Sequence, residues 1–139
     1  MLTRMYATLG IYGDQFDPVT LAESIGVRSY TYSLKGERRV LGVLKNSVLS
    51  LSSRDEIDGL SADEHIMSLI EQITPGYSQI RSALGRDGYI QCYLFFEGDV
   101  ENVCTSFSPD TLRQLAAIDA GLSIDSWTSA ADIGEAGTH

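Results

Sequence analysis

Apolar residues in the middle of the chain recur at steps of three and four residues. The repeat consists of Ile66, Leu69, Ile70, Ile73, Tyr77, Ile80 and Leu84. Residues at this spacing share one face of a helix that has 3.6 residues per turn. The pattern therefore predicts a long amphipathic helix over residues 61–84. Its start is Ser61, because Glu64 stands three residues later, at the spacing of a capping box.

Pro75 interrupts this long helical pattern. A proline inside a helix removes one backbone hydrogen bond and its ring clashes with the preceding turn. Thr74, directly before it, can cap a new helix, so we expect a kink or two consecutive helices near Thr74. The apolar spacing continues through the break, so both halves should face the same sheet.

Five other segments have the alternation or the β-branched and aromatic content of strands. They are residues 6–12, 27–34, 48–53, 89–96 and 122–127. Residues 40–44 fit a short strand or a loop equally well. Two shorter helices are predicted to start at Asp17-Pro18 and Ser108-Pro109, because proline suits the first helical position. Gly26 and Gly121 are the expected stops.

The predicted element order is β-α-β-β-α-β-α-β, which is an α+β fold. Two blocks of the chain resemble each other, Gly13-Asp14 with Phe16-Asp17-Pro18-Val19-Thr20-Leu21 and Gly98-Asp99 with Phe107-Ser108-Pro109-Asp110-Thr111-Leu112. They indicate two βαβ units around a β-α insert, unless both blocks are simply good helix starts. Right-handed crossovers favour a ferredoxin-like antiparallel or mixed sheet with helices on one face. Residues 1–128 should form a single domain and 129–139 a flexible tail.

The net charge of the protein limits the classes of molecule that it can attract. The 139 residues include 19 acidic and 10 basic residues, for a net charge of -9. This field repels nucleic acids and anionic membranes and attracts a basic protein, although acidity also serves solubility alone. Because the first residues lack a signal-peptide pattern and no apolar run has the length of a membrane span, we expect a cytoplasmic protein.

A sheet with helices on one face leaves its other face open, and the alternation predicts which side chains lie there. The candidate binding residues are Tyr6, Thr8, Tyr12, Tyr30, Tyr32, Tyr89, Gln91 and Tyr93. Tyrosine provides a large contact area and a polar tip at a low entropy cost. The alternative is that these tyrosines are ordinary strand residues that pack under a loop.

Evidence for catalytic chemistry is sparse. No phosphate-binding loop or dinucleotide fingerprint is present. His65, beside Glu64, is a candidate base in the cleft between the sheet and the long helix, and Asp14 and Asp17 are the other candidates for that cleft. No serine or cysteine is placed beside His65 by sequence, so a solvated or capping histidine is the favoured interpretation.

Metal and cofactor sites are not expected either. Asp14, Asp17 and Asp99 supply oxygen ligands, but Asp17 has a capping role and aspartates are common in turns. Cys92 and Cys104 are too few for a disulfide framework and lack metal spacing. The basic cluster Lys35, Arg38 and Arg39 is typical of a solvated hairpin.

Several short motifs resemble the bacterial family named domain of unknown function 4279. They are Gly13-Asp14 with Asp17-Pro18, Leu49-Ser50-Leu51-Ser52-Ser53, His65, Ser108-Pro109-Asp110-Thr111-Leu112 and Ile124-Asp125. The resemblance implies a small intracellular α+β domain with no established activity, and it brings no catalytic residue to this chain.

The leading hypothesis is a non-enzymatic protein-binding module. Immunity proteins, which cover the active site of a basic toxin, are one kind of small acidic module that fits. The alternative is a small-ligand-binding domain or an enzyme that uses the cleft near His65. Homodimerisation through the open sheet face is compatible with either hypothesis.

Overall fold

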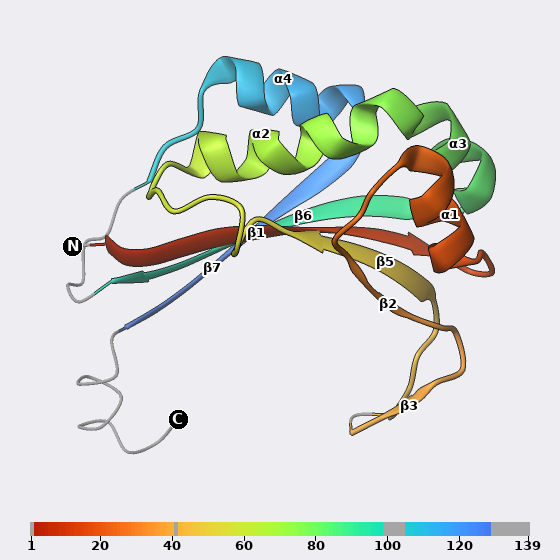
Figure 1. The fold of residues 1–139 in the computed structure, drawn as a ribbon. Helices are drawn as coiled ribbons and strands as arrows, with labels where there is room; N and C mark the ends of the chain where they lie inside the picture. The colour runs from red at the N-terminus through yellow and green to blue at the C-terminus, as the bar shows by residue number, and fades with distance from the viewer. Residues whose placement is uncertain (1, 41, 99–104, 129–139) are drawn as a thin grey trace.

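Among the described residues, the helices all lie on one side of a five-stranded sheet (Figure 1). The computed structural model describes residues 2–40, 42–98 and 105–128. The central strand β1 (Leu2–Gly13) runs antiparallel to β5 (Ser47–Ser52) on one side and to β6 (Tyr89–Gly98) on the other. At the edges, β2 (Thr31–Ser33) is antiparallel to β5, and β7 (Ala120–Thr128) is parallel to β6. The sheet order is β2-β5-β1-β6-β7.

The helical connections explain this order. Helix α1 (Pro18–Ile25) joins β1 to β2, two parallel strands with β5 between them. The long helical segment joins β5 to β6, which are parallel with β1 between them. Helix α4 (Pro109–Ala117) joins β6 to its direct neighbour β7. The α+β class, the mixed sheet and the single helical layer are confirmed, while the ferredoxin-like label and the internal duplication stay predictions.

The long helical segment is interrupted at Thr74 and Pro75, as the sequence predicts. It consists of α2 (Ala62–Ile73), a 3-10 turn η1 (Thr74–Gly76) and α3 (Tyr77–Leu84). The Ser61 hydroxyl accepts a hydrogen bond from the backbone N–H of Glu64 and fixes the start of α2. Both halves face the sheet, since Ile66 and Ile73 of α2 and Ile80 of α3 are fully buried.

The core lies between the helices and one face of the sheet. Its strand residues are fully or almost fully buried and alternate along the three central strands, namely Ala7, Leu9, Ile11, Leu49, Leu51, Ile90, Cys92 and Leu94. Burying one leucine or isoleucine contributes about 1.5–3 kcal/mol. The layered arrangement therefore rests chiefly on this apolar contact.

Several predicted element boundaries were wrong, including the start of β1, which is Leu2 rather than Tyr6. Helix α4 ends at Ala117 rather than near Gly121, and Asp119 takes the left-handed conformation (φ 53°) that turns the chain into β7. Gly121 lies within β7, where a Cβ atom would come within 2.2 Å of the Gln91 side chain. This glycine provides space for a neighbouring side chain and does not stop the helix. The second predicted strand is also shorter, because only residues 31–33 pair with β5.

Of the undecided residues 40–44, residues 40 and 42–44 belong to a hairpin. Strand β3 (Arg38–Arg39) pairs with β4 (Gly42–Val43) as a small separate sheet. We call the described residues 34–40 and 42–46 the hairpin arm. Figure 1 shows the arm projecting from the end of β2 and β5, on the side of the sheet away from the helices. The predicted tail, residues 129–139, lies outside the described residues.

Helices of the described chain are too short or too polar to cross a lipid bilayer.

The starts of α2 and α4 are tied together by Asp63. Its carboxylate accepts a hydrogen bond of 2.9 Å from the backbone N–H of Ser108, the N-cap residue of α4. This hydrogen bond, followed by one from the Thr111 side chain, lowers the pKa of Asp63. The ionised carboxylate is therefore the form that holds the two helices together.

Asp63 predicts a pH-dependent contribution to stability. Its pKa in the folded chain lies below that of the unfolded chain, so the contribution is present above about pH 4 and is lost as the pH falls through the folded pKa. Urea unfolding of wild type and Asp63→Asn should differ at about pH 7, and the difference should shrink as the pH falls below about 4. Asp110→Asn, an exposed carboxylate of α4, is the control. An Asp63→Asn deficit that stays constant over this range would contradict the assignment.

Candidate functional site

The strand register brings six of the eight predicted binding residues together on the face of the sheet away from the helices. Tyr6, Thr8 and Tyr12 of β1 stand opposite Phe95, Tyr93 and Tyr89 of β6, and Gln91 stands opposite Gly10. We call Tyr6, Thr8, Tyr12, Tyr89, Gln91, Tyr93 and Phe95 the aromatic face. Its members alternate with fully buried core residues, so they point away from the helical layer.

Tyr30 and Tyr32 are not part of the aromatic face. Tyr32 pairs with Leu49, whose side chain is fully buried under the helices, so Tyr32 lies on the helical side, 49% exposed at the sheet edge. Tyr30 precedes β2 and packs against the core, with its ring 6.4 Å from that of Tyr32. Alternation predicts which residues share a face of one strand, but only the register with β5 decides which face that is.

The aromatic rings support one another. Tyr12 and Tyr89 stack with ring centroids 4.7 Å apart and an interplanar angle of 9°. Phe95 stacks on Tyr6 at 5.0 Å and also contacts Tyr93 at 6.3 Å. Such pairs contribute about 0.5–1.5 kcal/mol beyond the area that they bury. The rings are therefore held in place before any partner arrives.

Tyr12 is the centre of this arrangement. Its ring lies across Gly10, where a Cβ atom would come within 2.5 Å of the ring. The Tyr12 and Tyr93 hydroxyls are hydrogen-bonded at 3.1 Å. Partial burial, and then the bond to Tyr93, raise the pKa of Tyr12 above its ordinary value. The Tyr12 hydroxyl therefore remains a neutral hydrogen-bonding group at any physiological pH.

Polar side chains flank the rings on the β7 side. The Gln91 amide donates a 2.7 Å hydrogen bond to the Ser123 hydroxyl of β7. Gly121, next to this pair, leaves the space that the Gln91 side chain occupies. Gln91 is thereby oriented across the face instead of extending freely into solvent.

Two arginines lie at the Tyr6 end of the aromatic face. The guanidinium carbons of Arg4 and Arg54 are 5.6 Å and 5.4 Å from the centroid of the Tyr6 ring, within cation–π distance. Both line a groove of about 290 Å³ that also contains Asp55 and Asp58. The sequence analysis missed these arginines, because no pattern connects the loop after β5 with the end of β1.

His65 is fully buried and is neither solvated nor a helix cap, which corrects the favoured sequence interpretation. The fold places Ser53 beside it, with Oγ 2.6 Å from His65 Nδ1, while His65 Nε2 lies 2.7 Å from the Gly59 carbonyl. Ser53 Oγ also accepts a bond from the Ala7 N–H. A carbonyl can only accept, so Nε2–H donates to Gly59; in the neutral imidazole Nδ1 then carries no proton and accepts from the Ser53 hydroxyl.

This buried network cannot act as a nucleophile and base on an outside substrate. Ser53 and His65 are both 0% exposed, and their hydrogen-bonding groups are occupied by each other, Ala7 and Gly59. The network joins β1, the loop after β5 and α2. Its geometry is that of a structural junction.

The remaining candidates have local roles. Asp17 caps α1, and hydrogen bonds from the Thr20 side chain and backbone lower the pKa of Asp17. Asp14 forms an ion pair with Lys35.

Asp99 and Cys104 lie outside the described residues. Cys92 is buried, which raises the pKa of its thiol to about 12. Over residues 2–40, 42–98 and 105–128, no three His, Cys, Asp or Glu side chains converge as metal ligands would.

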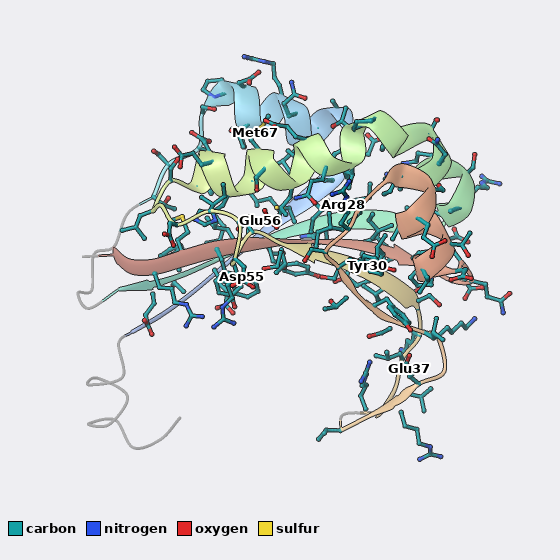
Figure 2. All side chains as sticks on the ribbon, viewed as in Figure 1. Arg28, Tyr30, Glu37, Asp55, Glu56 and Met67 are labelled. Atoms are coloured by element: carbon teal, nitrogen blue, oxygen red, sulfur yellow. The ribbon has the colours of Figure 1, made fainter. Side chains whose placement is uncertain are left out.

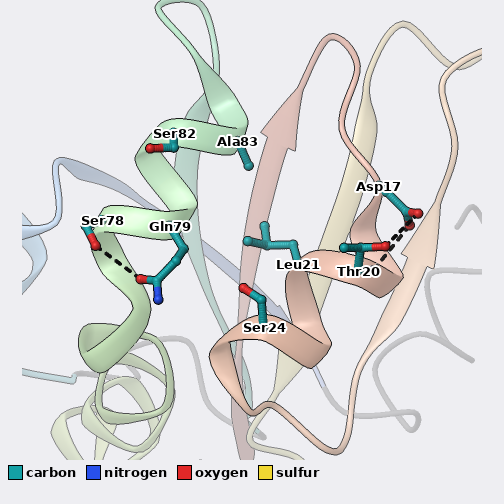
Figure 3. Close-up of a pocket in the computed structure, with 8 residues that line it drawn as sticks. All are labelled: Asp17, Thr20, Leu21, Ser24, Ser78, Gln79, Ser82 and Ala83. Atoms are coloured by element: carbon teal, nitrogen blue, oxygen red, sulfur yellow. Dashed lines mark hydrogen bonds between the residues drawn. The ribbon is translucent and has the colours of Figure 1, made fainter.

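An open groove of about 500 Å³ separates α1 from α3 (Figure 3). Leu21 and Ala83 form its apolar part, and hydroxyl side chains from both helices, the Gln79 amide and the Asp17 carboxylate line the remainder. Its one charged residue is Asp17, whose carboxylate already caps α1. The groove offers shape and hydroxyl groups but no free charge to orient a ligand.

When the chain is compared with known proteins, one family matches it. The family described as a domain of unknown function (DUF4279) matches residues 3–129, which confirms the resemblance seen in the sequence motifs. The curated proteins include no match to this chain. The solved structures include none either.

The Ser53–His65 junction should contribute strongly to stability. Ser53→Ala leaves the Ala7 N–H and His65 Nδ1 without partners, and we expect a loss of about 2–4 kcal/mol in the free energy of unfolding by urea titration. Ser52→Ala, the exposed neighbour, is the matched control and should change it by less than about 0.5 kcal/mol. A Ser53→Ala variant as stable as wild type would contradict the structural role.

Proposed function

The chain belongs to the family described as domain of unknown function 4279, and we propose that it is a non-enzymatic protein-binding module that uses the aromatic face. The observation that carries this proposal is the interlocked set of rings on the face of the sheet that no described helix covers. Aromatic side chains contribute much of the binding energy at protein interfaces, and here they are stacked in a fixed arrangement.

The shape of the surface favours a macromolecular partner. Sites for small molecules are usually concave and enclose most of the ligand, whereas a sheet face is broad. Tyrosine is enriched among residues that dominate binding energy, because a rigid ring loses little conformational freedom on binding. The stacks of Tyr12 on Tyr89 and of Tyr6 on Phe95 reduce that loss further.

Charge supports a basic protein partner. With a net charge of -9, the chain attracts basic proteins over a distance and speeds their encounter, while it repels nucleic acids and anionic membranes. An immunity-type protein that covers a basic toxin is one form of this proposal. A cytoplasmic location is also part of it.

The enzyme and small-ligand alternatives have less support. The Ser53–His65 pair is sealed from solvent, so the cleft near His65 offers no reactive group to a substrate. The groove between α1 and α3 is accessible, but its carboxylate is engaged as a helix cap. Neither place combines access with a free reactive group.

A site-specific photo-crosslinking experiment tests the proposal. Benzoylphenylalanine replaces Tyr89 (45% exposed), or Leu112 of α4 (48% exposed) as a matched position on the opposite side. After irradiation in cells, we expect a heterologous protein crosslinked from position 89 and not from position 112. Adding Tyr93→Ala should reduce the yield about tenfold or more, as loss of a central aromatic residue does. Equal yields at both positions, or none at position 89, would exclude the aromatic face as the partner site.

The molar mass in solution distinguishes self-association from the binding of a different protein. Light scattering of purified wild type and of Tyr12→Ala/Tyr93→Ala shows whether the aromatic face joins two copies. A wild-type dimer that the folded double variant converts to a monomer would assign the face to a self-interface and oppose the proposal. An equal mass for both proteins leaves the face free for another protein.

A further inference from the structure

The hairpin arm is basic and apolar in an acidic protein. Its residues 34–46 contain Lys35, Arg38, Arg39 and Lys45 against a single acid, Glu37, for a local net charge of +3. Lys35 and Arg39 are paired with Asp14 and Glu37, whereas Arg38 and Lys45 make no ion pair within the part of the chain that the structure describes.

Apolar side chains stand out on the same arm. Val40 is 102% exposed and Val43 is 56% exposed, with Leu34 at 43% near the base of the arm. Arg38 pairs with Val43 across the small sheet, so a free cation and an exposed apolar side chain lie next to each other. An isolated hairpin of this kind is marginally stable in water, and a surface that covers it would stabilise it.

A groove along α2 has the opposite character. It measures about 380 Å³, and Ile57, Met67 and Ser68 line it together with the carboxylates of Asp63, Glu64 and Glu71. Six acidic residues and no lysine or arginine occur between positions 55 and 80. Within the described residues, neither Glu64 nor Glu71 forms an ion pair, and Arg28 lines a neighbouring groove with Glu71 without reaching ion-pair distance. An apolar floor with free carboxylates on its rim fits a ligand that is apolar and basic.

The arm does not lie in this groove within one chain. Figure 2 shows Glu37 on the arm, which extends away from the helices, whereas Glu56 and Met67 lie in the region of α2. The hairpin arm and the α2 groove of one molecule therefore do not contact each other. A second copy can bind to both of them at once.

We propose that the hairpin arm of one copy docks into the α2 groove of a second copy. Val40 and Val43 contact Ile57 and Met67, and the cations of the arm lie beside Glu64 and Glu71. Reciprocal docking of two arms gives a closed twofold dimer. Neither the arm nor the groove contains a residue of the aromatic face, so the inference stands independently of the proposed function.

The first test reverses the charges of the hairpin arm in one variant and those of the α2 groove in another. The arm variant is Arg38→Glu/Lys45→Glu and the groove variant is Glu64→Lys/Glu71→Lys, all at exposed positions. We expect wild type to dimerise at low salt in sedimentation equilibrium, and each variant alone to raise the dissociation constant about tenfold or more. Added salt should weaken the wild-type dimer. Arg86→Glu/Arg113→Glu, at two other exposed cations, is the charge-matched control and should leave the dimer intact.

Mixing the two reversed variants is the decisive step. The acidic arm of one variant meets the basic groove of the other, and the native arm meets the native groove, so both contacts are restored in a mixed dimer. We expect the mixture to associate although each variant alone remains monomeric. Val40→Asp should also prevent dimerisation, whereas Leu112→Asp, at a matched exposed residue of α4, should not.

Circular dichroism of each variant ensures that a loss of dimer is not a loss of fold. A wild-type protein that stays monomeric at about millimolar concentration and low salt would overturn the inference. So would a dimer that both reversals leave unchanged, or reversed variants that fail to associate when mixed.

Discussion

The alternation of side chains along β1 is the constraint on which the rest of the structure depends. Ala7, Leu9 and Ile11 are fully buried beneath the helices, while Tyr6 and Tyr12 point the opposite way. Because β1 is hydrogen-bonded on both sides, its alternation is imposed on β5 and β6 as well. A slip of one residue would put the tyrosines in the core and the aliphatic residues in solvent. The register of one strand therefore sets both the core and the aromatic face.

Polar contacts then position the helices on that sheet. Ser53 and His65 join the loop after β5 to β1 and α2, and Asp63 joins α2 to the start of α4. A buried histidine beside a serine suggests catalysis when only residue types are considered. Its complete burial and full set of hydrogen bonds show that this pair belongs to the architecture. Exposure, more than residue identity, therefore shows that this pair is structural.

Charge is distributed unevenly over the fold. The net charge of -9 includes a basic arm and a long segment with no lysine or arginine at all. The aromatic face consists of uncharged side chains, and two arginines and nearby acidic residues lie at one end of it. The fold thus presents two kinds of surface, one with rigid rings and one with separated charges. Net charge alone describes neither surface.

Features that depend on near neighbours in the chain were predictable from the residues alone. The helix starts at Asp17 and Ser61, the break at Pro75 and the two sides of β1 all follow from capping, ring sterics and alternation within a few residues. Only the tertiary structure decided that Tyr32 lies on the helical side. Strand pairing likewise decided that Gly121 makes room for Gln91, and folding of the loop brought Ser53 to His65. These outcomes depend on the register and approach of segments distant in the chain, which local periodicity does not encode.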